Sequence, residues 1–166
     1  MEFVQTFTVD DELCDFIMEG IQVPPDITEP TAAEAPIEEL AEPVTAVCRE
    51  YFKRIPEYNY FVGIDELEFD MRMWITYIPQ WTFMKWTSEE GDLLNFYIFL
   101  KDTDSVVEFF NPMAKKTVRF KGTKGLGIVV PAAWLFTRRH TNTFETTAVF
   151  VMGLTRINNL NNVHKP

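Results

Sequence analysis

Two stretches of the chain carry residue types and spacings from which a chemical site could be built. Residues 77–89 read Tyr-Ile-Pro-Gln-Trp-Thr-Phe-Met-Lys-Trp-Thr-Ser-Glu, and residues 127–139 read Gly-Ile-Val-Val-Pro-Ala-Ala-Trp-Leu-Phe-Thr-Arg-Arg. The first ends in hydroxyl and carboxylate side chains, and the second in two arginines, whose guanidinium groups suit anions. Both stretches lie within residues 71–154, which hold about six strand-like segments. We therefore expect any site to be built on a β-sheet framework.

The remaining residues do not support other catalytic arrangements. The chain has two histidines, His140 and His164, and neither has a suitable nucleophile as partner in the sequence. The glycine-rich run 122–127 joins two expected strands and does not open a helix, so we expect a hairpin turn and no phosphate-binding loop. Cys14 and Cys48 each lie in a helical apolar pattern. They are expected to be buried free thiols, since without histidine neighbours they make a poor zinc site.

Composition favours one soluble domain with a substantial core. The chain has 166 residues, of which 46% are hydrophobic and 15 are phenylalanine. No apolar run reaches the roughly 20 residues of a membrane helix, and the N-terminus does not resemble a secretory signal. Residues 1–70 hold 18 acidic and 3 basic residues, a net of −15, and residues 71–166 hold 7 and 12, a net of +5, which together give −10. This balance disfavours nonspecific nucleic-acid binding. The acidic half is expected either to be solvated or to pack against the basic sheet.

The N-terminal third predicts two helices and a connector. Residues 1–8 alternate as a short strand, and residues 1–23 together predict a strand and a helix, with Thr8 as its N-cap and Pro24 as its end. Residues 24–37 are acidic and rich in Pro and Ala, which indicates an exposed connector. Residues 38–56 keep a helical apolar period, with Pro43 in the first turn.

The rest of the chain predicts a β-barrel core over residues 70–157 and a polar tail over 158–166. Residues 93–100 are nearly all apolar, so we expect a central strand that is buried on both faces. Strands separated by turns every 8–12 residues favour an antiparallel sandwich or barrel. The further expected strands are residues 70–77, 105–110, 116–121, 126–130 and 146–154.

Five pieces of the sequence, taken in order, resemble one family. Residues 77–89 are similar to the pattern Tyr-x-Pro-Gly-x-x-Phe-x-x-Trp-His-Ser-Glu, and residues 127–139 to Gly-x-x-x-x-x-Pro-x-x-Trp-x-His. Residues 7–15, 97–109 and 146–154 resemble the family's first strand and helix, its Tyr-Leu-Asn-Asp strand and its last strand. The chain thus resembles the 2-oxoglutarate- and Fe(II)-dependent oxygenases, above all their prolyl-hydroxylase-like branch, which is common in bacteriophages. The resemblance implies a mainly β (α+β) fold: a double-stranded β-helix, or jelly-roll barrel, with the N-terminal helices packed on one sheet.

The resemblance also implies an iron site that this chain has lost. The family binds Fe(II) through a His-x-Asp/Glu pair and a distant second histidine, which leaves positions free for 2-oxoglutarate and oxygen. Here the first histidine position is Thr87, the carboxylate is retained as Glu89, and the second histidine position is Phe136. One carboxylate does not hold Fe(II) usefully, and the Phe136 ring would fill the place of the metal. The degenerate positions therefore predict no metal site and no catalytic residues.

The co-substrate positions depart from the family as well. The family's Arg or Lys for the far carboxylate of 2-oxoglutarate corresponds to about Thr147 or Ala148, and Gln80 replaces the glycine of its Pro-Gly turn. His140 lies four residues past Phe136, in an expected turn, and nothing replaces the first histidine. No cofactor is therefore expected.

Two surfaces remain as candidate contacts. The mouth of the old pocket is expected to include Trp86, Glu89, Trp134, Arg138, Arg139 and His140. A basic patch is formed by Lys115, Lys116, Arg119, Lys121 and Lys124, with Arg119 and Lys121 on one face of a strand. The patch is either a solvated outer sheet face or a site for an acidic partner. The aromatic side chains of Trp74, Trp81, Phe83 and Trp86 are expected mostly in the core, and their exposure would indicate a protein interface.

The sequence therefore predicts a non-catalytic protein of the oxygenase fold that acts through protein–protein contacts. Its resemblance to a phage branch implies a phage-encoded virion component or an inhibitor of a host protein, in the cytoplasm of the infected cell or in the virion. We expect a phage or host protein partner, a possible homo-oligomer, no membrane and no nucleic acid. Two alternatives stay open. One is an active oxygenase with a remodelled site that uses Glu89 and His140 with Fe(II) and 2-oxoglutarate; the other is a binder of a small anion at Arg138 or Arg139.

Overall fold

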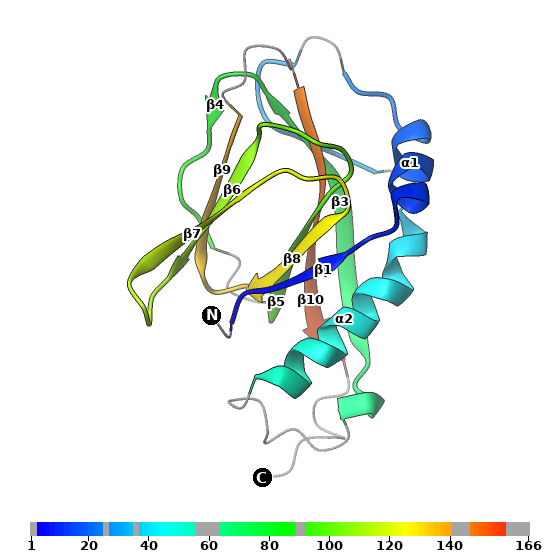
Figure 1. Ribbon diagram of the computed structural model, residues 1–166, viewed down its shortest axis with the longest axis vertical. Coiled ribbons are helices and arrows are strands. Elements are labelled where there is room, and N and C mark those ends of the chain that lie inside the picture. Colours follow the sequence, from blue (N-terminus) through cyan, green and yellow to red (C-terminus); the bar gives the residue numbers. More distant parts are fainter. Residues whose placement is uncertain are drawn as a thin grey trace.

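The computed structural model describes residues 3–24, 27–34, 37–55, 64–88, 92–140 and 147–158, and its elements form two sheets and a helical layer (Figure 1). The helical elements are α1 (Asp11–Glu19), η1 (Glu38–Leu40), α2 (Ala41–Arg54) and η3 (Ile64–Glu66). The strands are β1 (Gln5–Thr8), β2 (Thr31–Ala33), β3 (Phe69–Pro79), β4 (Thr82–Phe83), β5 (Leu94–Phe99), β6 (Val106–Asn111), β7 (Lys116–Lys121), β8 (Leu126–Pro131), β9 (Leu135–His140) and β10 (Thr147–Ile157).

The strands form a jelly-roll barrel of two antiparallel sheets. The large sheet has the order β1-β8-β5-β10-β3-β2, and the small sheet has the order β4-β9-β6-β7. Along the chain from β3 to β10 the strands pass back and forth between the two sheets, with β6 and β7 paired as a hairpin in the small one. This alternation is the winding of a double-stranded β-helix, so the fold predicted from the sequence is confirmed.

Two apolar layers hold the sheets and helices together. Even-numbered residues of β10, such as Phe150, face the small sheet, and odd-numbered residues, such as Val149, face the helices. Strand β5 is buried along its whole length, as its continuous apolar sequence predicts. The helices α1 and α2 cover the outer face of the large sheet, while the small sheet lies on the side away from them (Figure 1).

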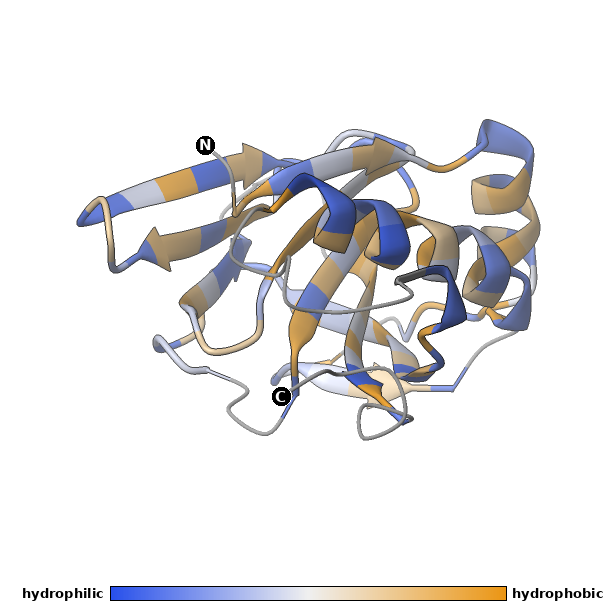
Figure 2. Ribbon diagram, turned by 90° about the horizontal axis from the view of Figure 1, so that it is seen from below, coloured by the Kyte–Doolittle hydropathy of each residue, from blue (hydrophilic) through white to orange (hydrophobic). Residues whose placement is uncertain are grey.

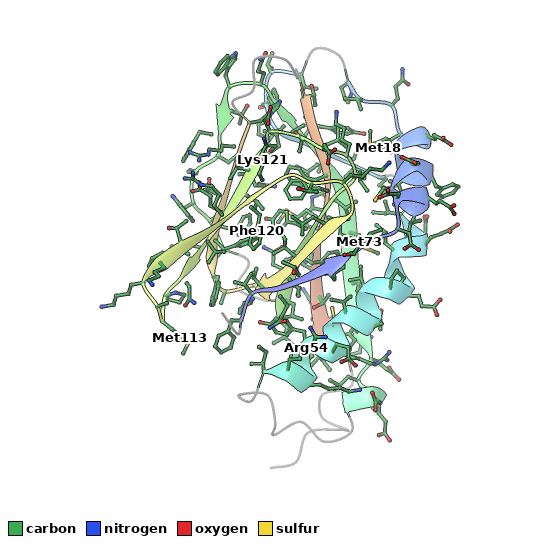
Figure 3. The ribbon with its side chains drawn as sticks, in the orientation of Figure 1. Met18, Arg54, Met73, Met113, Phe120 and Lys121 are labelled. Atoms are coloured by element: carbon green, nitrogen blue, oxygen red, sulfur yellow. The ribbon has the colours of Figure 1, made fainter. Side chains whose placement is uncertain are left out.

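The hairpin formed by β6 and β7 projects from the barrel, and hydrophobic and hydrophilic residues alternate along β7 (Figure 2). Phe120 points from β7 into the barrel, and Met113 lies at the tip of the hairpin (Figure 3). The outer face of this hairpin carries Arg119 and Lys121, which share one side of the strand as predicted.

The first helix begins and ends differently from the prediction. Thr8 belongs to β1, and α1 begins at Asp11 with Asp10 at its N-cap, without a side-chain capping hydrogen bond. The helix ends at Glu19, before Gly20, rather than at the later proline. The strand pairing of β1 with β8 takes Thr8 away from the helix, because its backbone continues the ladder opposite Leu126. In α2, Pro43 lies in the first turn, as predicted.

Three further expectations are corrected by the strand pairing. His140 is the last residue of β9 and not part of a turn. Residues 122–125 connect β7 of the small sheet to β8 of the large sheet, so they are a crossover and not a hairpin turn. Within the expected connector 24–37, residues 31–33 form β2 on the edge of the large sheet.

The crossover needs a glycine where it passes the start of α1. Gly125 has φ +82°, and a Cβ added there would lie 2.6 Å from the carbonyl oxygen of Val9. The same close approach lets the amide of Val9 donate to the carbonyl of Gly125 at 2.8 Å.

Among the described residues, no helix is long and apolar enough to cross a membrane. Most of the predicted polar tail, including His164, lies outside the described residues.

Candidate functional site

The two histidine positions of the family resemblance lie side by side in the small sheet. Thr87 and Phe136 form an isolated antiparallel bridge. The amide of Thr87 donates to the carbonyl of Phe136 at 3.0 Å, and the amide of Phe136 donates to the carbonyl of Thr87 at 2.8 Å. Directly opposed residues of an antiparallel pair project their side chains to the same face of the sheet. The two side chains therefore lie together on one face of the sheet.

The Phe136 ring occupies the barrel interior. It is 1% exposed and packs edge-on against Tyr97 of β5, with ring centroids 5.8 Å apart. Tyr97 also contacts Phe109 and Phe150, at 5.5 and 5.9 Å, so four rings fill the space between the sheets. The guanidinium carbon of Arg138 lies over the Phe136 ring, 5.5 Å from its centroid. An aromatic cluster therefore stands where the resemblance places the second histidine ligand.

These residues do not fit an Fe(II) centre. A threonine hydroxyl and a phenyl ring replace two imidazoles, and a phenyl ring offers no lone pair to a metal. Glu89, the retained carboxylate position, lies outside the described residues. Within the described ranges, no group of three or more His, Cys, Asp or Glu residues is placed to hold a metal ion. Thr147 and Ala148, at the co-substrate position, are 5% and 0% exposed in β10.

His140 lies on the same strand as Phe136 but at its far end. It is fully buried and stands opposite Thr82 of β4. Its position four residues from Phe136 places its side chain on the interior face of β9. The alternative in which His140 and Glu89 share a remodelled iron site requires a position for Glu89, which the described residues do not give.

A small cavity opens beside this aromatic cluster, at the mouth of the barrel between the two sheets. Its volume is about 210 Å³. Arg138 projects toward it from β9, and Thr76 from β3. The remaining lining residues are mostly apolar: Pro30, Thr31, Ala32, Trp74, Met84 and Met152.

The residues expected to line the pocket mouth lie in different parts of the structure. Of those that are described, Arg138 lines the cavity, whereas Trp134 is buried in the core against Phe3, with ring centroids 6.1 Å apart. Trp86 is 39% exposed beside Thr87. Arg139 faces the opposite side of the small sheet from Arg138, as alternation along a strand requires.

The predicted basic patch is partly neutralised by ion pairs. Glu108, 7% exposed at its side chain, accepts from Arg119 at 2.7 Å and lies 3.1 Å from Arg139. Lys121 pairs with Asp104 at 2.6 Å, and both side chains are exposed. For Lys115 and Lys116 no acidic partner is found among the described residues. The patch therefore carries less free charge than the sequence indicates.

The acidic N-terminal half packs mainly on the large sheet and not on the basic strand β7. Among the described residues, one ion pair links residues 1–70 to residues 71–166: Lys124 of the crossover meets Asp15 of α1 at 2.6 Å. This contact holds the pKa of Lys124 above its usual range through its hydrogen bond to Asp15.

Exposed apolar residues gather around the edge strand β4, contrary to the expectation that most of these aromatics lie in the core. Trp81 is 65% exposed, Phe83 59%, Trp86 39% and the neighbouring Leu135 of β9 44%. We call these four residues the aromatic edge. Trp81 also adopts φ +64°, an uncommon conformation for a bulky residue. Strand β4 pairs with β9 at only two residues, Thr82 and Phe83. The regular alternation of buried and exposed side chains along a strand therefore does not extend through residues 81–86.

Solved structures of oxygenases share this fold at low sequence identity. A prolyl-4-hydroxylase from Pseudomonas putida has a TM-score of 0.60 at 10% identity, over 95% of this chain and 94% of that chain. A 2OG-Fe(II) oxygenase family oxidoreductase from Burkholderia pseudomallei has a TM-score of 0.62 at 12% identity, over 93% and 84%. The viral collagen prolyl hydroxylase of Paramecium bursaria Chlorella virus-1, in its 2OG complex, has a TM-score of 0.55 at 10% identity, over 92% and 95%.

No protein-family model matches the sequence, and no curated protein matches it. The structural likeness establishes the fold, and it confirms the family resemblance at that level. Each of these neighbours covers nearly the whole of this chain, so the barrel and its helical layer belong to one shared architecture.

Proposed function

We propose that this chain, which has the fold of the 2-oxoglutarate/Fe(II) oxygenases, is a non-catalytic member of that fold that acts through protein–protein contacts. The observation that carries the loss of catalysis is the pair Thr87 and Phe136. They lie opposite each other, where the resemblance places both histidine ligands, and the Phe136 ring is packed into the aromatic core. A buried phenyl ring at a ligand position removes a metal donor and takes up space.

The aromatic edge supports the protein-binding part of the proposal. Trp and Phe are enriched at protein interfaces, and a cluster of exposed apolar side chains is costly to leave in water. Phe83 on the edge strand β4 and Trp81 directly before that strand are each more than half exposed. An edge strand also presents backbone groups that a partner strand can pair with.

The proposed setting is a bacteriophage, with the protein either in the virion or in the cytoplasm of the infected host as an inhibitor of a host protein. Its support is the sequence resemblance to a branch common in phages. The viral origin of one structural neighbour is consistent with this setting.

The catalytic part is tested by anaerobic titration of the purified protein with Fe(II) and 2-oxoglutarate. We expect no metal-to-ligand charge-transfer band, no thermal shift from iron and no succinate release in air. A band with one iron per chain would overturn the proposal and establish the alternative, an active oxygenase with a remodelled site. The matched variant Phe136→His in a Thr87→His background tests whether the two positions regain iron affinity.

The protein-contact part is tested with immobilised wild-type protein and two variants, exposed to extracts of infected and uninfected host cells. Trp81→Ser with Phe83→Ser removes the centre of the aromatic edge. Met113→Ser removes an equally exposed apolar side chain at the distant hairpin tip, where Met113 is 71% exposed. We expect a stoichiometric partner to be retained by wild type and Met113→Ser and lost by the double variant. Equal retention by all three proteins would contradict a role for the aromatic edge.

A further inference from the structure

We propose that the cavity at the barrel mouth binds a small monocarboxylate, with Arg138 pairing with the carboxylate and Thr76 donating a hydrogen bond to it. The site lies between β3, β9 and β10, with β2 and Met84, the residue after β4, at its border. It goes beyond the protein-contact function and does not depend on it, because the aromatic edge and the cavity are different surfaces.

Arg138 has no acidic partner among the residues that the structure describes. Its guanidinium contacts two neutral groups: Nη1 lies 3.3 Å from the sulfur of Met152, and the guanidinium carbon lies 5.5 Å from the centroid of the Phe136 ring. Its Nε is buried and has no hydrogen-bond partner. Among the described residues, no carboxylate pairs with it, whereas the neighbouring Arg139 is paired with Glu108. Leaving a partly buried guanidinium unpaired is costly, so a bound anion at this point would be stabilising.

Thr76 supplies an independent second observation. It is 3% exposed, lines the same cavity, and its Oγ1 is buried without a hydrogen-bond partner. Buried hydroxyl groups are normally satisfied by protein, water or ligand. An oxygen-bearing ligand in the cavity would satisfy Thr76 and Arg138 together.

The lining limits the class of ligand. Arg138 is the single charged residue among the described lining residues, so the cavity balances one negative charge. Trp74, Met84 and Met152 provide flat and flexible apolar walls, which suit a compact hydrocarbon or aromatic body. A dicarboxylate such as 2-oxoglutarate would bring a second charge that has no cationic partner in this lining. The geometry therefore favours an aliphatic or aromatic monocarboxylic acid.

The first experiment measures ligand-induced changes in melting temperature of the full chain in EDTA-containing buffer, with benzoate and hexanoate as probes. We expect a saturable upward shift from the two acids and none from benzamide, the neutral counterpart of benzoate. If 2-oxoglutarate raised the melting temperature as much as benzoate does, the assignment of the ligand to the monocarboxylates would be wrong. Because iron is chelated, this result is independent of the Fe(II) titration that tests the loss of catalysis.

The assignment to Arg138 is tested with two neighbouring variants. Arg138→Gln removes the cation and is expected to weaken benzoate binding at least about tenfold, while Arg139→Gln, on the opposite face of the same strand, is expected to leave it unchanged. Thr76→Val removes the hydroxyl at nearly constant volume and is expected to weaken binding severalfold. Unchanged affinity in Arg138→Gln would overturn the proposal.

A second measurement keeps the proposal falsifiable if Arg138→Gln folds poorly. In wild-type protein with labelled methionine methyl groups, benzoate is expected to move the signals of Met84 and Met152, which line the cavity. The signal of Met113, at the tip of the β6–β7 hairpin, is expected to stay in place. If the Met113 signal moved and the signals of Met84 and Met152 did not, benzoate would bind outside the cavity. If no methionine signal moved, binding in the cavity would be excluded.

Discussion

Thr87 and Phe136 exchange both backbone hydrogen bonds of an antiparallel bridge, at 3.0 and 2.8 Å. The two residues are 49 positions apart in the sequence and come from different resembling stretches. Their pairing brings those stretches together on one face of the small sheet. A threonine and a phenylalanine therefore meet at the point where the family resemblance expects two imidazoles. The bridge attaches the exposed Thr87 to β9, and the buried Phe136 ring packs the barrel interior.

The first prediction concerns the contribution of the Phe136 ring to stability. Phe136→Ala would leave a cavity beside Tyr97, so we expect the free energy of unfolding to fall by about 3–5 kcal/mol. Leu135→Ala is the matched control on the adjacent residue, because Leu135 is 44% exposed and its truncation removes little buried surface. Urea denaturation of both variants measures the difference. A loss below about 1 kcal/mol for Phe136→Ala would mean that the ring is not tightly packed.

The second prediction concerns Glu108 between two arginines on the outer face of the small sheet. Glu108→Gln removes a nearly buried carboxylate and leaves Arg119 and Arg139 facing each other. We expect a loss of roughly 1–3 kcal/mol, less than for a fully buried pair because Arg119 is 59% exposed at its side chain.

Asp104→Asn is the control for Glu108→Gln. It breaks the exposed pair with Lys121, so the expected loss in unfolding free energy is much smaller than that of Glu108→Gln. Equal losses in the two variants, measured by urea denaturation, would show that burial of Glu108 does not strengthen its ion pairs.

Much of the framework could be predicted from the sequence because its strands have strong patterns. Strand β7 was placed at its observed bounds, since Lys, Arg and apolar residues alternate along it. Strand β5 was placed within one or two residues, because a continuous apolar run between turn residues fits a strand buried on both faces. The two helices followed from their apolar period, although pairing of Thr8 in β1 moved the start of α1.

The parts that sequence reasoning missed depend on pairing between distant segments. Strand β9 contains two adjacent arginines and ends in His140, so its local sequence reads as polar, and its place between β4 and β6 decides its structure. The cavity combines residues from β2, β3, β9 and β10 with Met84, which follows β4, and Thr76 carries no local signal of its own in the sequence. The local sequence does not distinguish Arg138 from Arg139, whereas alternation along the strand places them on opposite faces of the small sheet.

The third prediction concerns the pH dependence of stability through Cys48. Burial raises the pKa of the Cys48 thiol to about 12. The unfolded thiol loses its proton near pH 8.5, so between that pH and about 12 the unfolded state binds fewer protons than the folded state. The contribution of the Cys48 thiol to the free energy of unfolding is therefore fully present below pH 8.5 and is lost as the pH rises towards 12.

Cys48→Ala separates this effect from other groups that titrate at high pH, such as the lysines whose pKa is raised by ion pairs. We expect the variant to be less stable than wild type at pH 7 but to lose less stability between pH 8 and pH 10.5. Urea midpoints across that range measure the two slopes. Parallel pH profiles for the two proteins would rule out Cys48 as a source of the alkaline sensitivity.

The fourth prediction concerns backbone strain at Trp81, which has φ +64° and a side chain that is 65% exposed. A left-handed conformation costs an L-residue roughly 1–2 kcal/mol, whereas glycine adopts it freely. Trp81→Gly is therefore expected to be more stable than Trp81→Ala by about 1 kcal/mol. At Phe83, in regular strand conformation, the order of the glycine and alanine variants should reverse.

Chemical denaturation of the four variants measures both differences. If Trp81→Ala is as stable as Trp81→Gly, the backbone at this position relaxes without the indole, and the strain is imposed by the side chain itself. If the predicted order holds, the turn conformation is fixed by the pairing of β4 with β9, and the exposed indole is presented by a backbone that the rest of the small sheet holds in place. Such a backbone would give a partner a rigid aromatic anchor at low cost in conformational entropy.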